Sequence, residues 1–417
     1  MRILYLSPGN LWPPTSGGGL RVYHLIRETI RYASVSFLGI HSPNESNNVS
    51  ISKDHCLKLG LERFVLVDKE RSYTPWKVVR GFTGPTPLSV LNYYDPNVAS
   101  ELSHILGEQT FDLVQIEQVQ LMGYVPTIRS SRSRPAVVCD WQNIESELME
   151  RYGEHAGSWA RKLYARRTAR LLRNVERRLL TECDAHLVTS KRDASMLRGL
   201  VPNAPVHIVE NGVDVARYSG GYTPSAPTMV ERAKQKRTDI VFVGSMDYHA
   251  NIDGAIYFCT EIWPRLHALA PQLRLMIVGS RPSDEVRDLA RAPGVVVTGT
   301  VDDVEPYYRG ALAAIVPLRI GGGTRLKILE AMAAGVPVVS TSIGAEGLAV
   351  NAGVNILLAD TPEETTRGLM ELYESYDTWQ RVSDRGRELA CTRYDWSVIG
   401  SSLHRIHSAL VDQQSRA

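Results

Sequence analysis

The sequence lacks the features typical of membrane-spanning and nucleic-acid-binding proteins. It contains no run of about 18 apolar residues, so no segment is expected to cross a bilayer. The net charge of +2 gives no overall reason to expect a nucleic-acid partner. The N-terminal apolar run is short and soon broken by prolines, which favours a first strand over a signal peptide. We therefore expect a cytoplasmic protein.

Metal and disulfide sites are also not expected. Five scattered cysteines, odd in number and never spaced as metal-binding pairs, favour a reducing compartment. Histidines such as His24, His104 and His249 are isolated, and no Asp-x-Asp sequence precedes the glycine-rich motif at residues 315–341. No cofactor metal is therefore predicted.

Short Val/Ile/Leu segments alternate with helix-length segments, which predicts parallel sheets covered by helices on both faces. The expected strands are Ile3–Leu6, Val35–Ile40, Phe64–Val67, Leu113–Ile116, Ala136–Cys139, Ala185–Val188, Val206–Val209, Ile240–Val243, Leu273–Val278, Val295–Thr298, Ala313–Val316 and Val336–Ser340. The expected helices include Leu20–Tyr32, Asn97–Leu106, Ile252–Ala270, Ser283–Arg291, Thr324–Ala334 and Trp396–Leu410.

A chain of 417 residues exceeds one ordinary core, so two domains are expected. Residues 212–237 are rich in Gly, Pro, Ser and charge, which is typical of a linker. We predict two doubly wound α/β domains, 1–211 and 238–395, facing a central cleft. The final helix within 396–417 has an apolar stripe that we expect to pack back on the first domain.

The most informative segment is residues 315–341, where a buried strand leads through glycines 321–323 into a helix. Glycines let a ligand approach the backbone, and the free N–H groups of a helix start suit a diphosphate. Gly322, Gly323 and Thr324 are therefore expected to bind phosphate. Arg325 and Lys327 place cations in the first helical turn, where the helix dipole disfavours them unless an anion binds.

Glu330 lies further along the same helix, and its residue type alone leaves two interpretations open. It could pair with Lys327 three residues earlier on a solvated face. Alternatively, its carboxylate could accept hydrogen bonds from the two hydroxyls of a ribose.

These residues resemble a known family. The segment GGGTRLKILEAMA is similar to the donor-binding helix of retaining glycosyltransferases of sequence family four, which share the two-domain GT-B fold. Further segments fit the family at the expected spacing; they contain Gly244, Ser245 and Asn251, Gly279, Thr298 and the sequence Asn211-Gly212-Val213-Asp214. The resemblance implies that these positions and Glu330 bind a nucleotide-sugar donor, with Glu330 on the ribose.

The sequence also departs from this family at three positions. Many members carry a glutamate where Gly322 stands, and an Arg and a Lys where Ser245 and Asn251 stand. We therefore expect Arg325 and Lys327 to supply the positive charge for the donor diphosphate, and we assign the catalytic role to these two residues and Glu330.

A second glycine-rich turn follows the first strand. Residues 15–21 include Gly18 and Gly19, which we expect beside the donor phosphates, since the resembling family faces the cleft with this loop. A plain tight turn is the alternative. Arg21 could add charge to the phosphates or lie on the surface.

Residues 140–145 follow another strand, at the sheet edge where such folds bind ligands. Related enzymes often have a histidine where Gln142 stands. We expect Asp140, Gln142, Asn143 and Glu145 on the acceptor side, with Asp140 or Glu145 contacting an acceptor hydroxyl; helix capping is the alternative.

Residues 151–178 contain about nine Arg or Lys and only two acids. Apolar Leu163, Ala169, Leu172, Val175 and Leu179 make this segment an amphipathic helix candidate. The region 151–182 would then contact an anionic membrane from the cytoplasmic side. A solvated connecting helix is the commoner arrangement.

Together these features predict a glycosyltransferase that moves a sugar from a nucleotide-diphosphate sugar to a hydroxyl of a polysaccharide, glycolipid or secondary metabolite. Retention at the anomeric carbon follows from the resemblance, and we expect the reaction to need no metal. Two alternatives are a sugar-nucleotide epimerase of similar architecture and a non-catalytic nucleotide-sugar-binding protein.

Overall fold

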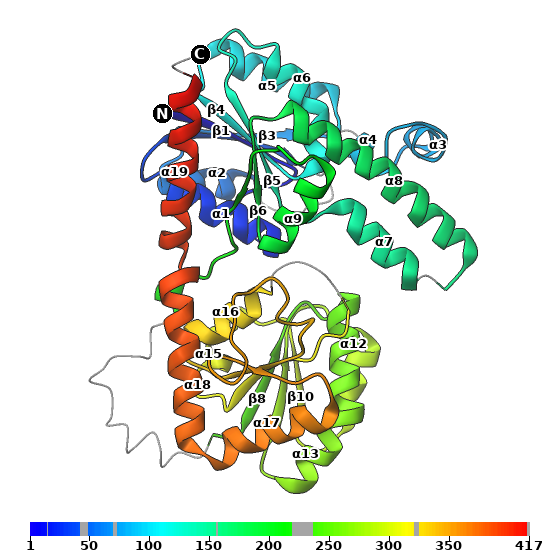
Figure 1. Cartoon of the computed structure of the whole chain (residues 1–417), viewed down its shortest axis with the longest axis vertical. Helices are drawn as coiled ribbons and strands as arrows, with labels where there is room; N and C mark the ends of the chain where they lie inside the picture. Colours follow the sequence, from blue (N-terminus) through cyan, green and yellow to red (C-terminus); the bar gives the residue numbers. More distant parts are fainter. Residues whose placement is uncertain are drawn as a thin grey trace. The chain divides into compact units, whose positions relative to one another are not determined.

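The computed structural model describes residues 1–14, 16–41, 49–69, 73–155, 157–218, 237–320 and 325–414. The chain divides into two compact units (Figure 1). Unit 1 comprises Met1–Glu210 and Ile399–Ala417, and unit 2 comprises Asn211–Val398.

Unit 1 is built on a seven-stranded parallel sheet in the order β3-β2-β1-β4-β5-β6-β7. Its elements are β1 (Arg2–Ser7), α1 (Gly17–Thr29), β2 (Ser34–His41), α2 (Val49–Leu59), β3 (Arg63–Asp68), α3 (Pro75–Thr83), α4 (Leu88–Tyr93), α5 (Pro96–Glu108), β4 (Leu113–Glu117), η1 (Val119–Tyr124), α6 (Val125–Arg129), β5 (Ala136–Trp141), α7 (Glu145–His155), α8 (Trp159–Glu182), β6 (Ala185–Val188), α9 (Lys191–Leu200) and β7 (Val206–Ile208). The strand order reverses between β1 and β4, and in such sheets ligands bind at the carboxyl ends of the strands beside this reversal.

Unit 2 contains a six-stranded parallel sheet in the order β10-β9-β8-β11-β12-β13. Its elements are α10 (Val215–Tyr218), β8 (Asp239–Val243), α12 (His249–Tyr257), η2 (Phe258–Ile262), α13 (Trp263–Leu269), β9 (Arg274–Val278), α14 (Asp284–Asp288), η3 (Leu289–Arg291), β10 (Val295–Gly299), α15 (Glu305–Tyr308), β11 (Ala313–Val316), α16 (Leu326–Ala333), β12 (Val338–Ser340), β13 (Leu357–Leu358), α17 (Pro362–Glu374), α18 (Tyr376–Leu389), η4 (Ala390–Tyr394) and the start of α19 (Trp396–Gln414). The reversal here lies between β8 and β11. The two parallel sheets confirm the predicted pair of doubly wound α/β domains.

The expected strands are buried because helices cover both faces of each sheet. In unit 1, β1, β4, β5 and β6 carry almost wholly buried runs such as Leu113–Glu117 and Ala136–Trp141. Polar side chains in these strands would be buried without hydrogen-bond partners. Apolar residues, and polar residues that hydrogen-bond within the protein, are therefore the ones that fit.

Helix α19 crosses from unit 2 into unit 1 near residue 398. Within unit 1, its buried His407 lies 3.0 Å from Gln115 Oε1 through Nε2 and 3.0 Å from the Tyr32 hydroxyl through Nδ1. Burial lowers the pKa of His407 to about 3, so this imidazole is neutral. The ring of His404 stacks on Tyr32 with centroids 4.0 Å apart.

Two predicted segments differ from the structure. In the expected linker 212–237, Val213 and Tyr218 are buried in the core of unit 2, and residues 219–236 lie outside the described residues. The expected basic helix 151–178 is two helices, α7 and α8, which pack on each other. Helix α8 begins after Ser158, whose side chain accepts a hydrogen bond from the Arg161 amide and so caps a new helix.

Candidate functional site

The carboxyl ends of β8 and β9 meet at two glycines in unit 2. The amide of Gly244 donates to the carbonyl of Val278 at 3.0 Å. Gly279 has a φ of +157°, and a Cβ on it would lie 1.6 Å from the Gly244 carbonyl oxygen. The loops that follow β8 and β9 can therefore approach each other only because Gly279 has no side chain.

Lys327 on α16 reaches this same edge. Its Nζ donates to Asn251 Oδ1 at 2.8 Å, while Asn251 Nδ2 donates to the Ser245 carbonyl at 2.8 Å. The ammonium also lies 4.7 Å from the Phe242 ring centroid, and a Cβ on Gly244 would come within 2.8 Å of it. Burial, with the nearby charge of Arg325, lowers the pKa of Lys327 to about 7.

The loop after β9 brings a second cation to this edge. Arg281 pairs with Asp247 at 2.6 Å and donates to Ser245 Oγ at 3.4 Å. Ser245 Oγ itself donates to Asp247 Oδ1 at 2.6 Å and lies 3.3 Å from Ser280 Oγ. Arg281 has a φ of +49°, an uncommon conformation that often marks functional loops.

Glu330 lies one turn beyond Lys327 on α16, between two tyrosines. The Tyr308 hydroxyl donates to Glu330 Oε2 at 3.4 Å, and the rings of Tyr218 and Tyr308 pack edge to face. Burial raises the pKa of Glu330, although Lys327, Arg217 and the two tyrosine hydroxyls act against this shift. The residue as a whole is only partly buried.

The start of the donor motif is only partly described. Gly322, Gly323 and Thr324 lie outside the described residues, and Arg325 is the N-cap residue of α16. Nearby, the Gly279 amide donates to the Gly299 carbonyl at 3.3 Å, as does the hydroxyl of Thr298 at 2.9 Å. The predicted donor-side residues that the structure describes in unit 2 therefore gather along one sheet edge.

In unit 1, the glycine-rich turn lies against Gln142. The Ser16 hydroxyl accepts from the Gly19 amide and caps α1, while a Cβ on Gly18 would lie 2.2 Å from Gln142 Oε1. Gln142 Oε1 accepts from Gln118 Nε2 at 3.1 Å. Among the described residues, the buried Nε2 of Gln142 has no hydrogen-bond partner, so it can donate to a ligand.

Arg21 and Asp140 do not occupy the accessible positions that we predicted. They form a bidentate ion pair, with both Asp140 oxygens accepting from Arg21 at 2.7 and 2.8 Å. Arg21 is 1% exposed and Asp140 is fully buried. Neither is a surface residue, and the burial of Asp140 keeps its carboxylate away from the surface where we expected an acceptor hydroxyl to reach it.

The remaining acceptor-side candidates are Asn143, which precedes helix α7, and Glu145, which begins it. Asn143 is partly exposed. Burial raises the pKa of Glu145, while a hydrogen bond with Gln120 acts against this rise. Buried Glu176 of α8 accepts from the Ser146 amide at 2.9 Å and from its hydroxyl at 2.6 Å. The capping carboxylate of α7 therefore comes from α8 rather than from Asp140 or Glu145.

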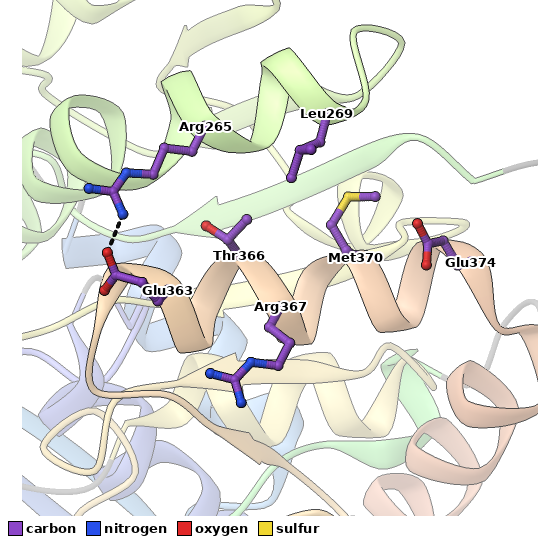
Figure 2. A pocket seen from close by; sticks show the side chains of 7 residues that line it. All are labelled: Arg265, Leu269, Glu363, Thr366, Arg367, Met370 and Glu374. Atoms are coloured by element: carbon purple, nitrogen blue, oxygen red, sulfur yellow. Dashed lines mark hydrogen bonds and ion pairs between the residues drawn. The ribbon is translucent and has the colours of Figure 1, made fainter.

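No group of three or more His, Cys, Asp or Glu residues arranged to hold a metal ion occurs among the described residues. A groove of about 460 Å³ lies between α13 and α17 in unit 2, with an ion pair between Arg265 and Glu363 at one end (Figure 2). None of its lining residues is a predicted site residue, so this groove is not the candidate site.

None of the helices in the described part of the chain has both the length and the hydrophobicity needed to cross a bilayer.

Sequence reasoning missed several residues of the site. Tyr218, Tyr308 and Arg217 surround Glu330, and Arg281 accompanies Ser245. Gln118, which holds Gln142, has a φ of +83° that sequence does not reveal. Two of these missed residues, Arg281 and Gln118, could have been proposed from the sequence. Each follows a buried strand at its carboxyl end, where such sheets bind ligands.

Both halves of the chain match models of known protein families. Residues 55–217 match the model of Glycosyltransferase Family 4, and residues 237–375 match Glycosyl transferases group 1. An uncharacterized 44.6 kDa protein in the cps region of Klebsiella pneumoniae is 23% identical over 175 residues, 40% of this chain and 45% of that protein. Phosphatidyl-myo-inositol mannosyltransferase of Mycolicibacterium smegmatis is 27% identical over 208 residues, 48% of this chain and 51% of its own length.

The chain thus spans about half the length of these curated relatives. Among solved structures, Anabaena Alr3699/HepE in complex with UDP superposes with a TM-score of 0.64 at 14% identity. That alignment covers 98% of this chain and all of the Anabaena chain, and it supports the GT-B fold.

Proposed function

Both halves of the chain carry glycosyltransferase domains, and we propose that the protein moves a sugar from a nucleotide-diphosphate sugar to an acceptor hydroxyl. The observation that carries this proposal is the position of the Lys327 ammonium, 2.8 Å from Asn251 Oδ1 at the carboxyl edge of unit 2. UDP sugars are the first donors to test, because Alr3699/HepE binds UDP. The acceptor is a polysaccharide, glycolipid or secondary metabolite.

The positive charge that faces the donor diphosphate is supplied by segments next to the loop that follows β8. The family resemblance places a lysine at residue 251 and an arginine at residue 245, yet this chain has Asn251 and Ser245. Lys327 brings an ammonium to Asn251, and Arg281 brings a guanidinium to Ser245. Arg325 adds a further cation at the start of α16. Cations placed in advance stabilise a departing diphosphate without a metal ion.

Glu330 has the ribose role in this proposal. Its oxygen Oε2 accepts from the Tyr308 hydroxyl, and the remaining acceptor positions of the carboxylate can bind ribose hydroxyls. The acceptor hydroxyl then attacks the anomeric carbon, and the glycosidic bond to the diphosphate breaks with retention. Gln142 Nε2 is the group of unit 1 that we assign to the transferred sugar or the acceptor.

The experiment is a nucleotide-release assay with UDP, GDP, dTDP and ADP sugars in the presence of a chelator. Transfer predicts release of one nucleoside diphosphate that increases when candidate acceptors are added. Isomerised sugar without nucleotide release would favour the epimerase, and donor binding without turnover would favour the non-catalytic protein. Loss of all activity with the chelator would contradict the metal-independent mechanism.

Donor binding is expected to take up a proton above about pH 7. The pKa of Lys327 is lowered from 10.5 to about 7, so its amine is increasingly neutral as the pH rises above that value. A bound diphosphate favours the ammonium and raises this pKa again, so donor affinity falls with increasing pH. Calorimetry at about pH 8 in buffers of different ionisation enthalpy should detect up to about one proton taken up. Lys327→Met should abolish the uptake; equal uptake in this variant would contradict the assignment.

A further inference from the structure

Helix α3 exposes an apolar face. Trp76, Val79 and Phe82 are 68%, 52% and 50% exposed, and their spacing of three residues places them along one side of the helix. Large apolar side chains that gather on a surface usually mark a binding site. Residues 73–94 contain no Asp or Glu, whereas Arg80 is exposed on this helix.

The first turns of α8 extend this apolar face. Trp159 and Leu163 are 79% and 61% exposed and lie four residues apart, on the same side of α8 as Arg167. Arg167 donates to the carbonyls of Gly81 and Gly84 at 2.9 and 2.7 Å, at the end of α3. The rings of Phe82 and Tyr164 lie 5.3 Å apart. These contacts join α3 and α8, which lie near each other in Figure 1.

The same part of α8 is strongly basic. Arg161, Lys162 and Arg166 are exposed, and residues 155–175 contain no acid. On the neighbouring α7, Glu147 and Glu150 are ion-paired with Arg151, Arg192 and Arg173. We call the exposed set the α3–α8 surface; it comprises Trp76, Val79, Arg80, Phe82, Trp159, Arg161, Lys162, Leu163 and Arg166.

This surface differs from the membrane contact expected from the sequence. That expectation relied on Ala169, Leu172, Val175 and Leu179, which are buried in unit 1. Of the apolar residues that were expected to form the stripe, Leu163 is exposed. The exposed apolar residues instead come from α3 and from the tip of α8.

We propose that the α3–α8 surface binds an anionic lipid bilayer. Tryptophan and phenylalanine favour the boundary between headgroups and acyl chains, and unpaired cations are attracted by anionic headgroups. A surface with exposed aromatic residues, four exposed cations and no acid on either of its two segments complements such a boundary. The inference does not depend on the proposed sugar transfer.

The test is co-sedimentation of the full chain with phosphatidylcholine vesicles, with and without phosphatidylglycerol, at low and high salt. We expect binding to anionic vesicles that high salt weakens. Trp76→Ser with Phe82→Ser should lower partitioning at least about tenfold, and each of Arg161→Gln and Lys162→Gln should lower it about fivefold. Leu269→Ser in unit 2 is the matched control, because Leu269 is 63% exposed, and it should bind like the wild type.

Circular dichroism of each variant separates loss of binding from loss of folding. Absence of binding to anionic vesicles at low salt would overturn the proposal. Equal binding by the wild type and the Trp76→Ser/Phe82→Ser variant would also overturn it. Self-association of the wild type that this double variant abolishes, without vesicle binding, would identify the surface as a protein interface instead.

Discussion

Replacement of Lys327 with alanine is expected to lower kcat/KM for sugar transfer at least about 100-fold. Lys327 Nζ is fixed by Asn251 and lies beside Gly244, whose missing side chain leaves room for it. Removal of the ammonium takes one preplaced charge from the departing diphosphate, so kcat should fall more than affinity. The measurement is steady-state kinetics on the donor identified by the nucleotide-release assay.

A second substitution tests the relocation of this charge directly. Asn251→Lys in the Lys327→Ala background returns an ammonium to the same place from α12. We expect it to recover activity to within about tenfold of the wild type, whereas Asn251→Ala in that background should recover none. If Lys327→Ala is as active as the wild type, or if Asn251→Lys gives no recovery, the charge is supplied elsewhere.

The second large effect concerns the stability of unit 1. Asp140→Asn keeps the shape of the side chain but leaves the Arg21 guanidinium, which is 1% exposed, without its carboxylate. The loss of one partner of a buried ion pair costs about 3–5 kcal/mol. Urea denaturation of the full chain, followed by circular dichroism, should show this loss in the unfolding transition of unit 1.

Glu117→Gln is the matched control for this prediction. Glu117 is equally buried, and its Oε1 accepts from Gln115 Nε2 at 2.8 Å. Burial and the charge of Asp140 raise the pKa of Glu117, which favours the neutral carboxyl, and we expect an amide to replace it at little cost. We expect a loss below about 1 kcal/mol. If both variants lose equal stability, the Arg21–Asp140 charge pair is not what stabilises this region.

Much of the fold was predictable because burial imposes a simple pattern. A strand covered on both faces must be apolar along its length, and segments such as Leu113–Ile116 and Ala185–Val188 could therefore be located. The gathering of the expected donor-side residues at one sheet edge was predictable because glycines and polar residues follow these strands at their carboxyl ends. Gly244, Gly279 and Lys327 meet there.

Pairings between distant residues were not predictable from local patterns. Asp140 and Arg21 are 119 residues apart, and nothing near either residue indicates that they bind each other rather than a ligand. The break between α7 and α8 depends on one cap, Ser158, within a segment that otherwise favours a continuous helix. The tyrosines around Glu330 come from α10 and α15, and only the tertiary fold brings them to α16.

Binding of a nucleoside diphosphate to the sheet edge of unit 2, through Lys327 and Glu330, is what the proposed function requires first. It is tested most directly by calorimetric titration of UDP, GDP, dTDP and ADP into the full chain, with a chelator present. We predict selective binding of one nucleotide without metal, weakened at least about tenfold in Glu330→Ala because two ribose hydrogen bonds are lost. Failure of every nucleotide to bind the folded protein, or equal binding by Glu330→Ala, would contradict the claim.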